Sequence, residues 1–441
     1  MFKESKYNFL LYYDSRPLLY NGVTGNGFCM SEDEWALLRK MLDRPDEFSN
    51  LYPDDFKRLK RMGYIVDDDF DETSWLLYKN KMEVYSDRDY MLIVNPTLEC
   101  NFRCWYCYEN HSDGRMSPSM VTRVKKHIKL KVEREHIPAL SISWFGGEPL
   151  LCFDSVVYPV SLYARNLCRK NNIPCHLSIT TNGYLLNGDM IPKIKKIGLE
   201  SFQITLDGDK AKHDKVRRNG KEPSYDRIVE NIRTLCSELD DVSVTLRINY
   251  DNSTFTRYEI FDILNEFAPS VRDRININLQ KVWQVASNVD ESPHTLLNEF
   301  MDKAFEMGYP LTMGGGINKG ICHSCYASRS AYANINYDGA VFKCTARDYT
   351  DSNAMGRLNA DGNIAWDVKK ISKAFAVTPI ENTSCMECKY LPLCGGQCIQ
   401  KHIEKGFFCV HPDKTLLESE IIRQYRNNII AFNARAKKQE P

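Results

Sequence analysis

The cysteines restrict what this chain can fold into more than any other residue type, because they are numerous and unevenly placed. Of 16 cysteines in 441 residues, three fall within residues 100–107 (CNFRCWYC) and eight lie between Cys322 and Cys409. In a large chain, clustered cysteines without a secretory signal indicate metal binding or chemistry rather than a disulfide framework. Two regions of the chain are therefore expected to be shaped around thiol ligands.

The bulk composition excludes several classes of protein. Lys plus Arg and Asp plus Glu both number 58, so no net charge favours a nucleic-acid or membrane partner. No run of about 18 apolar residues is present to form a transmembrane helix. The first 17 residues lack the apolar segment of a signal peptide, since Asp14 and Arg16 interrupt it. We therefore expect a cytoplasmic protein.

Residues 89–309 alternate between strand and helix patterns. Apolar residues at helical spacing predict one helix over 224–235, and Ser117-Pro118 predicts the start of another. Such alternation predicts α/β architecture with a parallel sheet. Six strands are fewer than a closed TIM barrel contains, so we expect a partial (β/α)6 TIM-like barrel that functions at its C-terminal strand ends. The expected strands lie within residues 91–97, 139–147, 175–183, 201–208, 242–250 and 274–278.

Residues 1–88 form a separate pattern of strands followed by helices. Two short strands are expected at 9–14 and 17–22, and a capping box at Ser31–Glu34 opens a helix. A second helix follows Pro53, and residues 62–69 form a further strand. This order predicts a winged-helix-like domain. The alternative is an N-terminal extension that only packs against the rest of the chain.

Residues 310–412 are rich in cysteine and glycine and carry little hydrophobic periodicity. Asp338-Gly339 is a hairpin signal within this segment. A segment with so little apolar pattern needs covalent or metal links to keep its shape. Residues 413–441 are expected to form a polar helix that ends in a disordered basic stub.

Cys100, Cys104 and Cys107 follow the first barrel strand, so they lie on a loop at its C-terminal end. Three thiolates would hold three irons of a [4Fe–4S] cluster and leave the fourth iron open. An open coordination position distinguishes catalytic metal sites from structural ones. The alternative is a zinc site whose fourth ligand is a histidine such as His111.

A second motif, WFGGEP at residues 144–149, ends the second barrel strand. Gly146 and Gly147 permit close approach of a ligand to the backbone. Glu148 offers a carboxylate to a ligand cation. The alternative is an ordinary glycine turn.

Together these two motifs resemble the radical S-adenosylmethionine (SAM) superfamily. CNFRCWYC matches its C-x3-C-x-Φ-C motif with Tyr106 at the aromatic position, and GGEP matches its methionine-binding motif. The resemblance implies that the three cysteines hold a cluster whose open iron chelates the amino and carboxylate groups of SAM. Gly146 belongs to the implied cofactor site, in which Gly147 and Glu148 contact the SAM ammonium.

The resemblance extends to three further positions. Thr181 in ITTNG matches a ribose contact, Arg217 in HDKVR matches a SAM-carboxylate contact, and Asn249 in RINYD lies near SAM. The alternative for each position is ordinary scaffolding of the fold. The family chemistry is reductive cleavage of SAM to methionine and a 5′-deoxyadenosyl radical, which takes a hydrogen atom from the substrate.

The later cysteines resemble the SPASM domain, a Cys-rich iron–sulfur domain, and Cys322 adds an eighth thiol. By analogy one auxiliary [4Fe–4S] cluster would use Cys322, Cys325, Cys344 and Cys398. The other would use Cys385, Cys388, Cys394 and Cys409. If Cys322 is not a ligand, one cluster keeps an open iron. The alternative is a pair of zinc ribbons. The cysteines outside these motifs are expected to be small buried hydrophobes: Cys29, Cys152, Cys168, Cys175 and Cys236.

SPASM enzymes mostly modify peptides, and residues 1–88 resemble a module that binds a leader peptide as an added strand. We therefore expect a maturase that forms an intramolecular cross-link in a ribosomally made precursor peptide. It would take electrons from a donor such as flavodoxin or ferredoxin. The type of bond and the general base are not evident from the sequence. Candidates near ligand cysteines, expected to be supporting rather than catalytic, are Tyr108, Glu109, His323, Arg329 and Asp348.

Two alternative functions stay open. An anaerobic sulfatase-maturating enzyme shares both motif sets, but that family has an aspartate directly after the cysteine corresponding to Cys344. Here Thr345 follows, and Asp348 is the next carboxylate. The other alternative is a non-enzymatic zinc-binding interaction protein.

Overall fold

The computed structural model describes residues 1–251, 253–282, 295–313 and 325–437. They divide into two compact units. The first unit comprises Met1–Ser86, Gly316–Ser330 and Ser372–Pro441, and the second comprises Asp87–Gly315 and Ala331–Ile371. These two units are defined by how densely their residues contact one another. The functional domains expected from the sequence, with boundaries near residues 88, 309 and 412, therefore remain a prediction. None of the helices in the described ranges is long and apolar enough to cross a bilayer.

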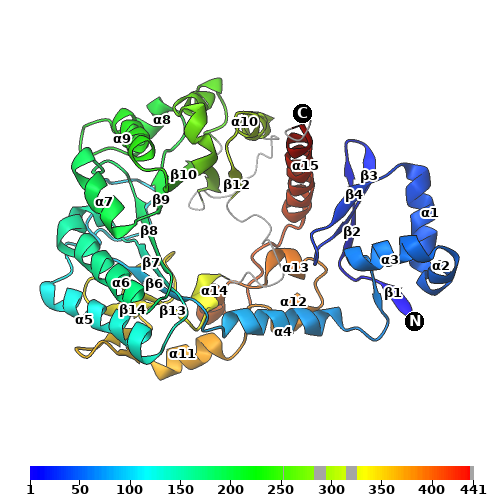
Figure 1. Cartoon of the computed structure of the whole chain (residues 1–441), viewed down its shortest axis with the longest axis horizontal. Helices are drawn as coiled ribbons and strands as arrows, with labels where there is room; N and C mark the ends of the chain where they lie inside the picture. Colours follow the sequence, from blue (N-terminus) through cyan, green and yellow to red (C-terminus); the bar gives the residue numbers. More distant parts are fainter. Residues whose placement is uncertain (252, 283–294, 314–324, 438–441) are drawn as a thin grey trace. The chain divides into compact units, whose positions relative to one another are not determined.

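The second unit is built on a large, mostly parallel sheet (Figure 1). The six expected strands are confirmed as β6 (Tyr90–Val94), β7 (Leu140–Trp144), β8 (Cys175–Thr181), β9 (Ser201–Thr205), β10 (Ser243–Tyr250) and β11 (Ile275–Lys281). They lie side by side in sequence order and pair in parallel. The chain is therefore an α/β protein, as expected.

The sheet is wider than the six strands that the sequence predicted. Beyond β11 lies the parallel strand β12 (Leu311–Met313), and beyond β6 lies the parallel strand β13 (Tyr332–Ile335). Three antiparallel strands then follow: β14 (Ala340–Phe342), β15 (Gly356–Leu358) and β16 (Ile364–Trp366). The expected hairpin at Asp338-Gly339 joins β13 to β14, and Gly339 has a φ of 84° that suits glycine.

Helices alternate with the parallel strands of the second unit. They are α5 (Pro118–Lys129), α6 (Tyr158–Lys170), α7 (Ile191–Ile197), α8 (Lys210–Val216), α9 (Tyr225–Glu238) and α10 (Thr295–Glu306). A further helix, α11 (Val368–Phe375), comes after β16 and belongs partly to each unit. Shorter π and 3-10 turns are η1 (Leu130–Arg134), η2 (Pro149–Cys152), η3 (Phe153–Val157), η4 (Gly188–Met190), η5 (Tyr258–Asn265) and η6 (Pro269–Arg274). In Figure 1 the strands follow a curve, and α5, α6, α7 and α9 lie outside it. The predicted helix starts are confirmed, since Ser117 caps α5 and α9 buries its apolar residues.

The two faces of this sheet differ in chemistry. Ile204, Leu246 and Ile277 are fully buried in the core, and their neighbours along each strand point to the opposite face. On that opposite face, polar residues such as Gln203 and Asn276 are only half-buried. Parallel sheets covered on both faces read as continuous apolar runs. The alternating pattern of these strands therefore leaves a polar inner face.

The first unit opens with two small sheets. One pairs β2 (Asn8–Tyr13), β3 (Arg16–Asn21) and β4 (Gly27–Cys29) in antiparallel order, and the other pairs β1 (Phe2–Glu4) with β5 (Ile65–Asp67). The helices are α1 (Glu32–Asp43), α2 (Pro45–Leu51), α3 (Pro53–Met62), α4 (Glu72–Val84), α12 (Thr383–Met386), α13 (Leu391–Cys394), α14 (Ile399–Lys405) and α15 (Thr415–Lys437), with the turn η7 (Tyr326–Ser328). The capping box of Ser31 and Glu34 is confirmed at the start of α1.

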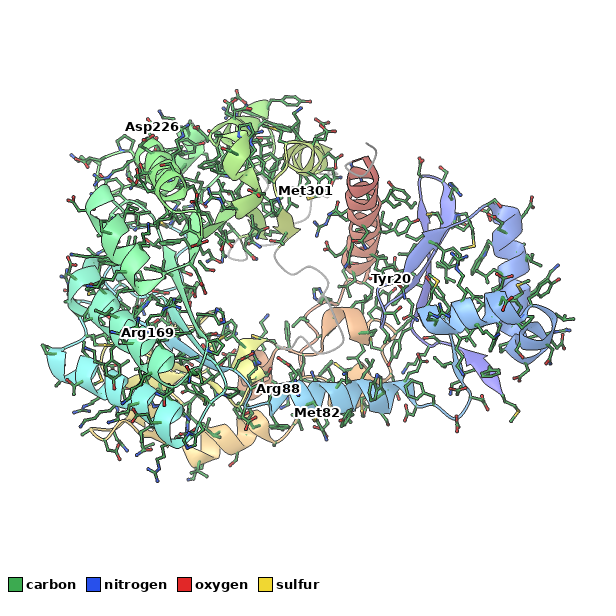
Figure 2. The ribbon with its side chains drawn as sticks, viewed as in Figure 1. Tyr20, Met82, Arg88, Arg169, Asp226 and Met301 are labelled. Atoms are coloured by element: carbon green, nitrogen blue, oxygen red, sulfur yellow. The ribbon has the colours of Figure 1, made fainter. Side chains whose placement is uncertain are left out.

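The three-stranded sheet of the first unit is packed on both faces. Leu19 of β3 joins Phe56 and Leu59 of α3 in one core. On the other face, Phe9 and Tyr20 pack with Ile421 of α15. Figure 2 shows Tyr20 between the sheet and this helix. The C-terminal helix is thus part of the structure that surrounds the N-terminal strands.

Candidate active site

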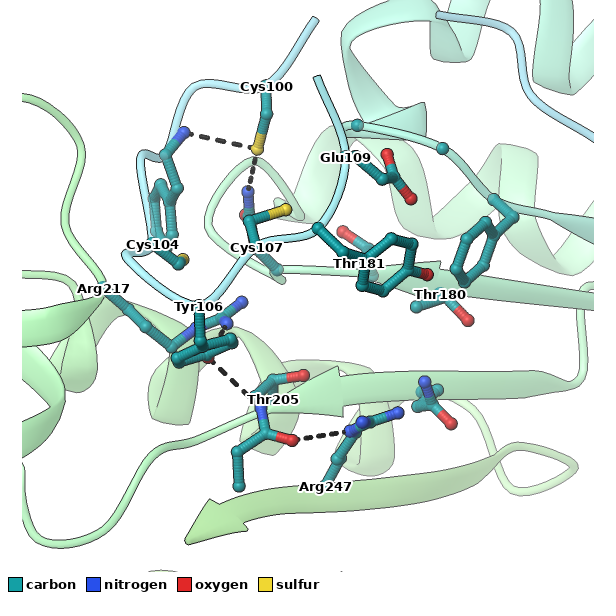
Figure 3. A pocket seen from close by; sticks show the side chains of 18 of the residues that line it. Cys100, Cys104, Tyr106, Cys107, Glu109, Thr180, Thr181, Thr205, Arg217 and Arg247 are labelled. Carbon is teal, nitrogen blue, oxygen red and sulfur yellow. Dashed lines mark hydrogen bonds between the residues drawn. The ribbon is translucent and has the colours of Figure 1, made fainter. Parts of the chain in front are cut away.

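The C-terminal ends of β6 to β11 surround one pocket (Figure 3). Six of the seven predicted cofactor residues and all three cysteines of the first motif line it. These are Cys100, Cys104, Cys107, Tyr106, Gly146, Gly147, Thr181, Arg217 and Asn249. The loops that carry the predicted residues therefore lie together, because the carboxyl ends of parallel strands meet at one edge of a sheet.

The cysteine loop turns tightly, since the Cys107 N–H donates to the Cys104 carbonyl over 3.0 Å. Two N–H groups reach the sulfur of Cys100, from Phe102 at 3.4 Å and from the Asn182 amide at 3.9 Å. Burial raises the pKa of the Cys100 thiol to about 12 and that of Cys107 to about 11. A bare thiolate is thus disfavoured here, whereas a bound metal would compensate its charge.

The two glycines of GGEP let the segment before Cys100 pack closely against the backbone that follows β7. A Cβ on Gly147 would lie 2.2 Å from the Glu99 carbonyl oxygen, and one on Gly146 would lie 2.5 Å from that of Thr97. Gly146 also has a φ of 98°. Backbone hydrogen bonds join the same segments, from Gly147 to Thr97 (3.2 Å) and from Glu148 to Glu99 (2.8 Å). The backbone that approaches these glycines closely is therefore that of the segment before Cys100, rather than a ligand.

Glu148 is fully buried and does not line the pocket. Its carboxylate accepts hydrogen bonds from the Thr181 hydroxyl (2.7 Å), the Asn182 N–H (2.7 Å) and the Leu150 N–H (2.9 Å). Burial raises the pKa of this carboxyl, although these three donors oppose the shift. Glu148 thus fixes the end of β8, and its contact with a SAM ammonium remains a prediction.

Tyr106 enters a buried polar cluster that includes Asp207, which the sequence reasoning missed. Its hydroxyl donates to Asp207 and accepts from Arg217 at 2.6 Å and from Asn249 at 3.2 Å. Arg217 also forms an ion pair of 3.8 Å with Asp207. Burial alone would lower the pKa of Arg217, but Cys104, Tyr106 and Asp207 raise it well above its usual value. The cluster therefore fixes three predicted residues in one arrangement.

The neutral side chain of His213 holds two residues of this cluster in place through hydrogen bonds. The Asp207 N–H donates to Nδ1 of His213 at 3.1 Å, so Nε2 carries the proton and donates to the Ser224 hydroxyl at 3.0 Å. Ser224 in turn donates to the carbonyl of Arg217 at 2.6 Å. Burial lowers the pKa of His213 well below its usual range. The HDKVR segment thus positions Arg217 through its own histidine.

The match to a known family follows this geometry. Residues 94–254 match the model of the Radical SAM superfamily. They form a radical SAM domain. The matched segment begins at the end of β6 and ends after β10, so it contains both motifs and the cluster around Asp207.

Three curated relatives differ in how much of the chain they match. Fe-coproporphyrin III synthase of Methanosarcina barkeri is 26% identical, and the match spans 42% of this chain and 43% of that protein. The radical SAM cyclopropyl synthase TigE of Paramaledivibacter caminithermalis is 20% identical over 89% of this chain and 88% of its own length. A cysteine-type anaerobic sulfatase-maturating enzyme of Clostridium novyi is 25% identical over 70% and 87%.

Two solved structures share the fold. SuiB of Streptococcus suis bound to S-adenosylmethionine is 16% identical, with a TM-score of 0.50 over 92% of this chain and 98% of that chain. Native anSMEcpe with bound AdoMet and Kp18Cys peptide is 16% identical, with a TM-score of 0.55 over 78% and 99%.

Three charged residues that line the radical SAM pocket were not predicted as ligand contacts: Arg247, Glu109 and Lys281. Arg247 lines the pocket from the inner face of β10. Glu109 lines it beyond Cys107, and burial together with the charge of Asp348 raises its pKa to about 8. Within the described residues, Oε2 of Glu109 is buried without a hydrogen-bond partner. Glu109 was expected only in a supporting role, from its place beside Cys107, whereas the position of Arg247 in the pocket follows from the strand register.

The other candidates near ligand cysteines are dispersed. Tyr108 lines the pocket with Glu109. Arg329 forms an ion pair with Glu83 at 3.2 Å in the first unit. His323 lies outside the described residues.

Among the described residues, six of the predicted auxiliary ligands belong to the first unit. The charge of Cys409 raises the pKa of both Cys385 and Cys394, and Cys388 also acts on Cys385, although burial is the larger cause in each case. Burial raises the pKa of Cys325, and the charge of Cys398 adds to this shift. The charges of the four thiols in the second predicted ligand set thus act on one another, while their role in a cluster remains a prediction.

The first predicted ligand set is less complete. Cys344 belongs to the second unit, where the Ala346 N–H donates to its sulfur at 3.3 Å. Cys322 lies outside the described residues. In the part of the chain that the structure describes, no three His, Cys, Asp or Glu side chains are placed to hold a single metal ion.

The five cysteines outside the motifs divide into two kinds. Cys152, Cys168, Cys175 and Cys236 are buried, as expected for small hydrophobes. The same prediction was wrong for Cys29, which is half-buried on the edge strand β4 and lines a groove. Its strand leaves it beside an opening rather than in the core.

Proposed function

We propose that the chain is a peptide maturase that uses SAM and an iron–sulfur cluster to install an intramolecular cross-link in a ribosomally made precursor peptide. One observation carries the cofactor part of this proposal. The three cysteines of CNFRCWYC and the GGEP loop meet in one pocket at the strand ends of a radical SAM domain.

The donor set of the pocket fits a [4Fe–4S] cluster. Three thiols line one pocket, N–H groups point at the sulfur of Cys100, and the cationic Arg217 lies near Cys104. Soft thiolates with donated hydrogen bonds are the usual ligands of such clusters. The bound cluster and SAM supply the reductive cleavage that yields a 5′-deoxyadenosyl radical.

The residues of the pocket would bind the cluster and SAM and orient them. Thr181 and Asn249 present polar groups on the pocket wall, and Glu148 holds the Thr181 hydroxyl in place. Tyr106 is fixed by Asp207 and Arg217, which sets the position of the cysteine loop against β9. Such prior fixing reduces the reorganisation that binding would otherwise require.

Two observations support a peptide as the substrate. The inner face of the sheet is polar, and the carboxamide of Gln203, which lines the pocket, would hydrogen-bond to a peptide main chain. In addition, SuiB has been solved bound to its precursor peptide SuiA.

We assign leader binding to the edge strand β4 of the winged-helix-like module. A groove of about 350 Å³ lies beside this strand and is lined by β4, α1, α2 and α3. Its wall is largely apolar, with Met30, Met41 and Leu59 among its residues. An added strand would satisfy the outward backbone groups of β4, while the groove takes alternate side chains.

One of those outward groups is already occupied. Met30 N–H donates to the Pro17 carbonyl, and antiparallel pairs alternate, so the Cys29 N–H points away from β3. It donates to the Tyr425 hydroxyl of α15 at 3.0 Å. A leader strand would therefore have to replace this hydrogen bond.

The auxiliary clusters are part of the proposal. Cys385, Cys388, Cys394 and Cys409 would hold one cluster, and Cys325, Cys344 and Cys398 would hold the other, with Cys322 as the fourth candidate ligand. These clusters would relay electrons, and a flavodoxin or ferredoxin would supply them. The proximity of the first four thiols supports this assignment.

A combined assay tests the proposal. Anaerobically reconstituted protein with SAM and a reductant should release 5′-deoxyadenosine, and a small peptide encoded beside the gene should lose hydrogen mass in proportion. Deletion of residues 1–88 should abolish peptide binding but not SAM binding. Absence of SAM cleavage, or peptide binding that survives the deletion, would contradict the proposal.

The second candidate is an anaerobic sulfatase-maturating activity. The match to the Clostridium novyi enzyme, which spans 87% of that protein, favours it. Thr345 after Cys344 disfavours it, because Asp348 would have to replace the expected aspartate. A Cys-x-Pro-x-Arg peptide separates the two functions, since only the sulfatase activity would convert its cysteine to an aldehyde.

A further inference from the structure

The pocket holds two arginines whose surroundings differ. Arg217 is buried against Asp207 and donates to the Tyr106 hydroxyl. Arg247 is half-buried on the inner face of β10, and its Nε donates to the neutral side-chain oxygen of Asn249 at 2.8 Å. The charge of Arg217 is therefore compensated within the protein, whereas that of Arg247 is compensated far less.

Strand register fixes where Arg247 points. It pairs with Thr205 of β9 and Asn278 of β11, so the three side chains share the inner face of the sheet. Figure 3 shows the Arg247 guanidinium near Thr205 on the pocket wall, with Cys100 across the pocket in this view. The Asn249 contact engages Nε and leaves the two terminal nitrogens of the fork for a ligand.

Within the described ranges 1–251, 253–282, 295–313 and 325–437, no carboxylate forms an ion pair with Arg247. A half-buried guanidinium without a counter-charge is unfavourable because part of its hydration is lost. Burial accordingly lowers the pKa of Arg247, although Tyr108, Tyr106 and Asp207 act in the opposite direction, and the nearby Arg217 adds repulsion. A bound anion would relieve both costs.

We propose that Arg247 binds the carboxylate of a molecule held in this pocket, through its two terminal nitrogens. Planar guanidinium groups match carboxylates in a two-point arrangement. The inference rests on the proposed function, which supplies two sources of this chemistry. One is the methionine carboxylate of SAM, and the other is an acidic side chain of the peptide substrate.

Two binding measurements distinguish the sources. The first compares SAM with decarboxylated SAM by equilibrium titration of the anaerobically reconstituted enzyme. The second compares a fluorescent peptide encoded beside the gene with a copy in which Asp and Glu are replaced by Asn and Gln. Each pair of ligands differs mainly in the carboxylate, so the ratio of dissociation constants reports its recognition.

The variants are Arg247→Gln and Arg247→Lys. Arg169→Gln is the matched control, because Arg169 is exposed at the end of α6 (Figure 2). Arg247→Gln should reduce the carboxylate preference by about tenfold or more in one arm. Arg247→Lys should retain part of it as a point charge, and the control should match the wild type.

The outcome identifies the ligand. A loss confined to the SAM pair assigns Arg247 to SAM, and a loss confined to the peptide pair assigns it to the substrate. Unchanged ratios in both arms, in variants with wild-type iron content and thermal stability, would overturn the inference. A wild-type protein that fails to bind SAM would instead refute the proposed function.

Discussion

The two cysteine regions of this molecule are built in different ways. The loop that carries Cys100, Cys104 and Cys107 is held by strand ends, by backbone hydrogen bonds to the GGEP segment and by the cluster around Asp207. The cysteines from Cys385 to Cys409 lie in short helices and loops, with Lys414 donating to the Cys409 sulfur at 3.5 Å. The first region has a frame that is independent of its ligands, and the second depends far more on them.

The largest effect should come from removing one cysteine of the framed loop. Cys104→Ala should abolish SAM cleavage, because an incompletely ligated cluster is lost. Iron content should fall by about four atoms per chain, with little change in thermal stability. Cys385→Ala is the matched comparison, and it should lower the melting temperature more than Cys104→Ala does. The opposite order of stabilities would contradict the difference between the two regions.

A substitution at Gly147 tests whether backbone contacts hold the loop that carries Cys100, Cys104 and Cys107. Gly147→Ala would place a Cβ 2.2 Å from the Glu99 carbonyl oxygen and 2.4 Å from that of Leu98. We expect a loss of about 3 kcal/mol in the free energy of unfolding, since backbone must move to accept the methyl group. Urea denaturation measures the loss. Gly188→Ala is the control, because no atom lies within 4 Å of its Cβ position. Equal stability of the two variants would show that the loop is not fixed by this contact.

A buried histidine should make the stability of the second unit depend on pH. His127 Nδ1 donates to the Gly362 carbonyl at 2.8 Å, and Nε2 accepts from the Tyr90 hydroxyl at 2.7 Å. Burial lowers the pKa of His127 to about 4 from its usual value of about 6.5. The unfolded chain therefore binds more protons between these values, and stability falls as the pH drops through this window.

The expected loss is about 2 kcal/mol between pH 7 and pH 5. Urea denaturation at both values measures it. His127→Gln keeps a donor and an acceptor without a titrating ring, so it should lose this part of the pH dependence. If the variant shows the full wild-type slope, another group is responsible.

The smallest effect should come from the edge of β4 in the first unit. Tyr425→Phe removes the acceptor of the Cys29 N–H, worth about 1 kcal/mol. A leader strand would no longer displace this bond, so leader affinity should rise about fivefold. Fluorescence anisotropy with a labelled leader peptide measures the change. Tyr13→Phe is the control, since the Tyr13 ring contacts Tyr425 at 5.5 Å between centroids. A weaker affinity in Tyr425→Phe would contradict the assignment of the leader to this edge.

Much of the second unit followed from local pattern. Strands, helices and motifs lie close in sequence, so the six core strands and the meeting of Cys100, Gly147 and Thr181 were predictable. The role of Glu148 was less predictable from the sequence. Its partners Thr181 and Asn182 sit on the next strand, and only the pairing of β7 with β8 brings them to it.

The missed features depend on register or on long-range contact. Asp207 and Arg247 became evident only when adjacent strands were aligned, since each has an ordinary local sequence. Strands β13 to β16 are too short for a periodic signal, so the width of the sheet was underestimated. The contact between Tyr425 and Cys29 joins residues far apart in the chain, where local patterns carry no information.

The most direct test of the central claim is a combined analysis of iron, sulfide and zinc with electron paramagnetic resonance, on anaerobically reconstituted wild-type protein and Cys104→Ala. The account predicts about twelve irons with matching sulfide in the wild type, and a reduced-cluster signal that changes when SAM is added. In Cys104→Ala about eight irons should remain, without a response to SAM. Zinc without sulfide, or a SAM response that persists in Cys104→Ala, would contradict it.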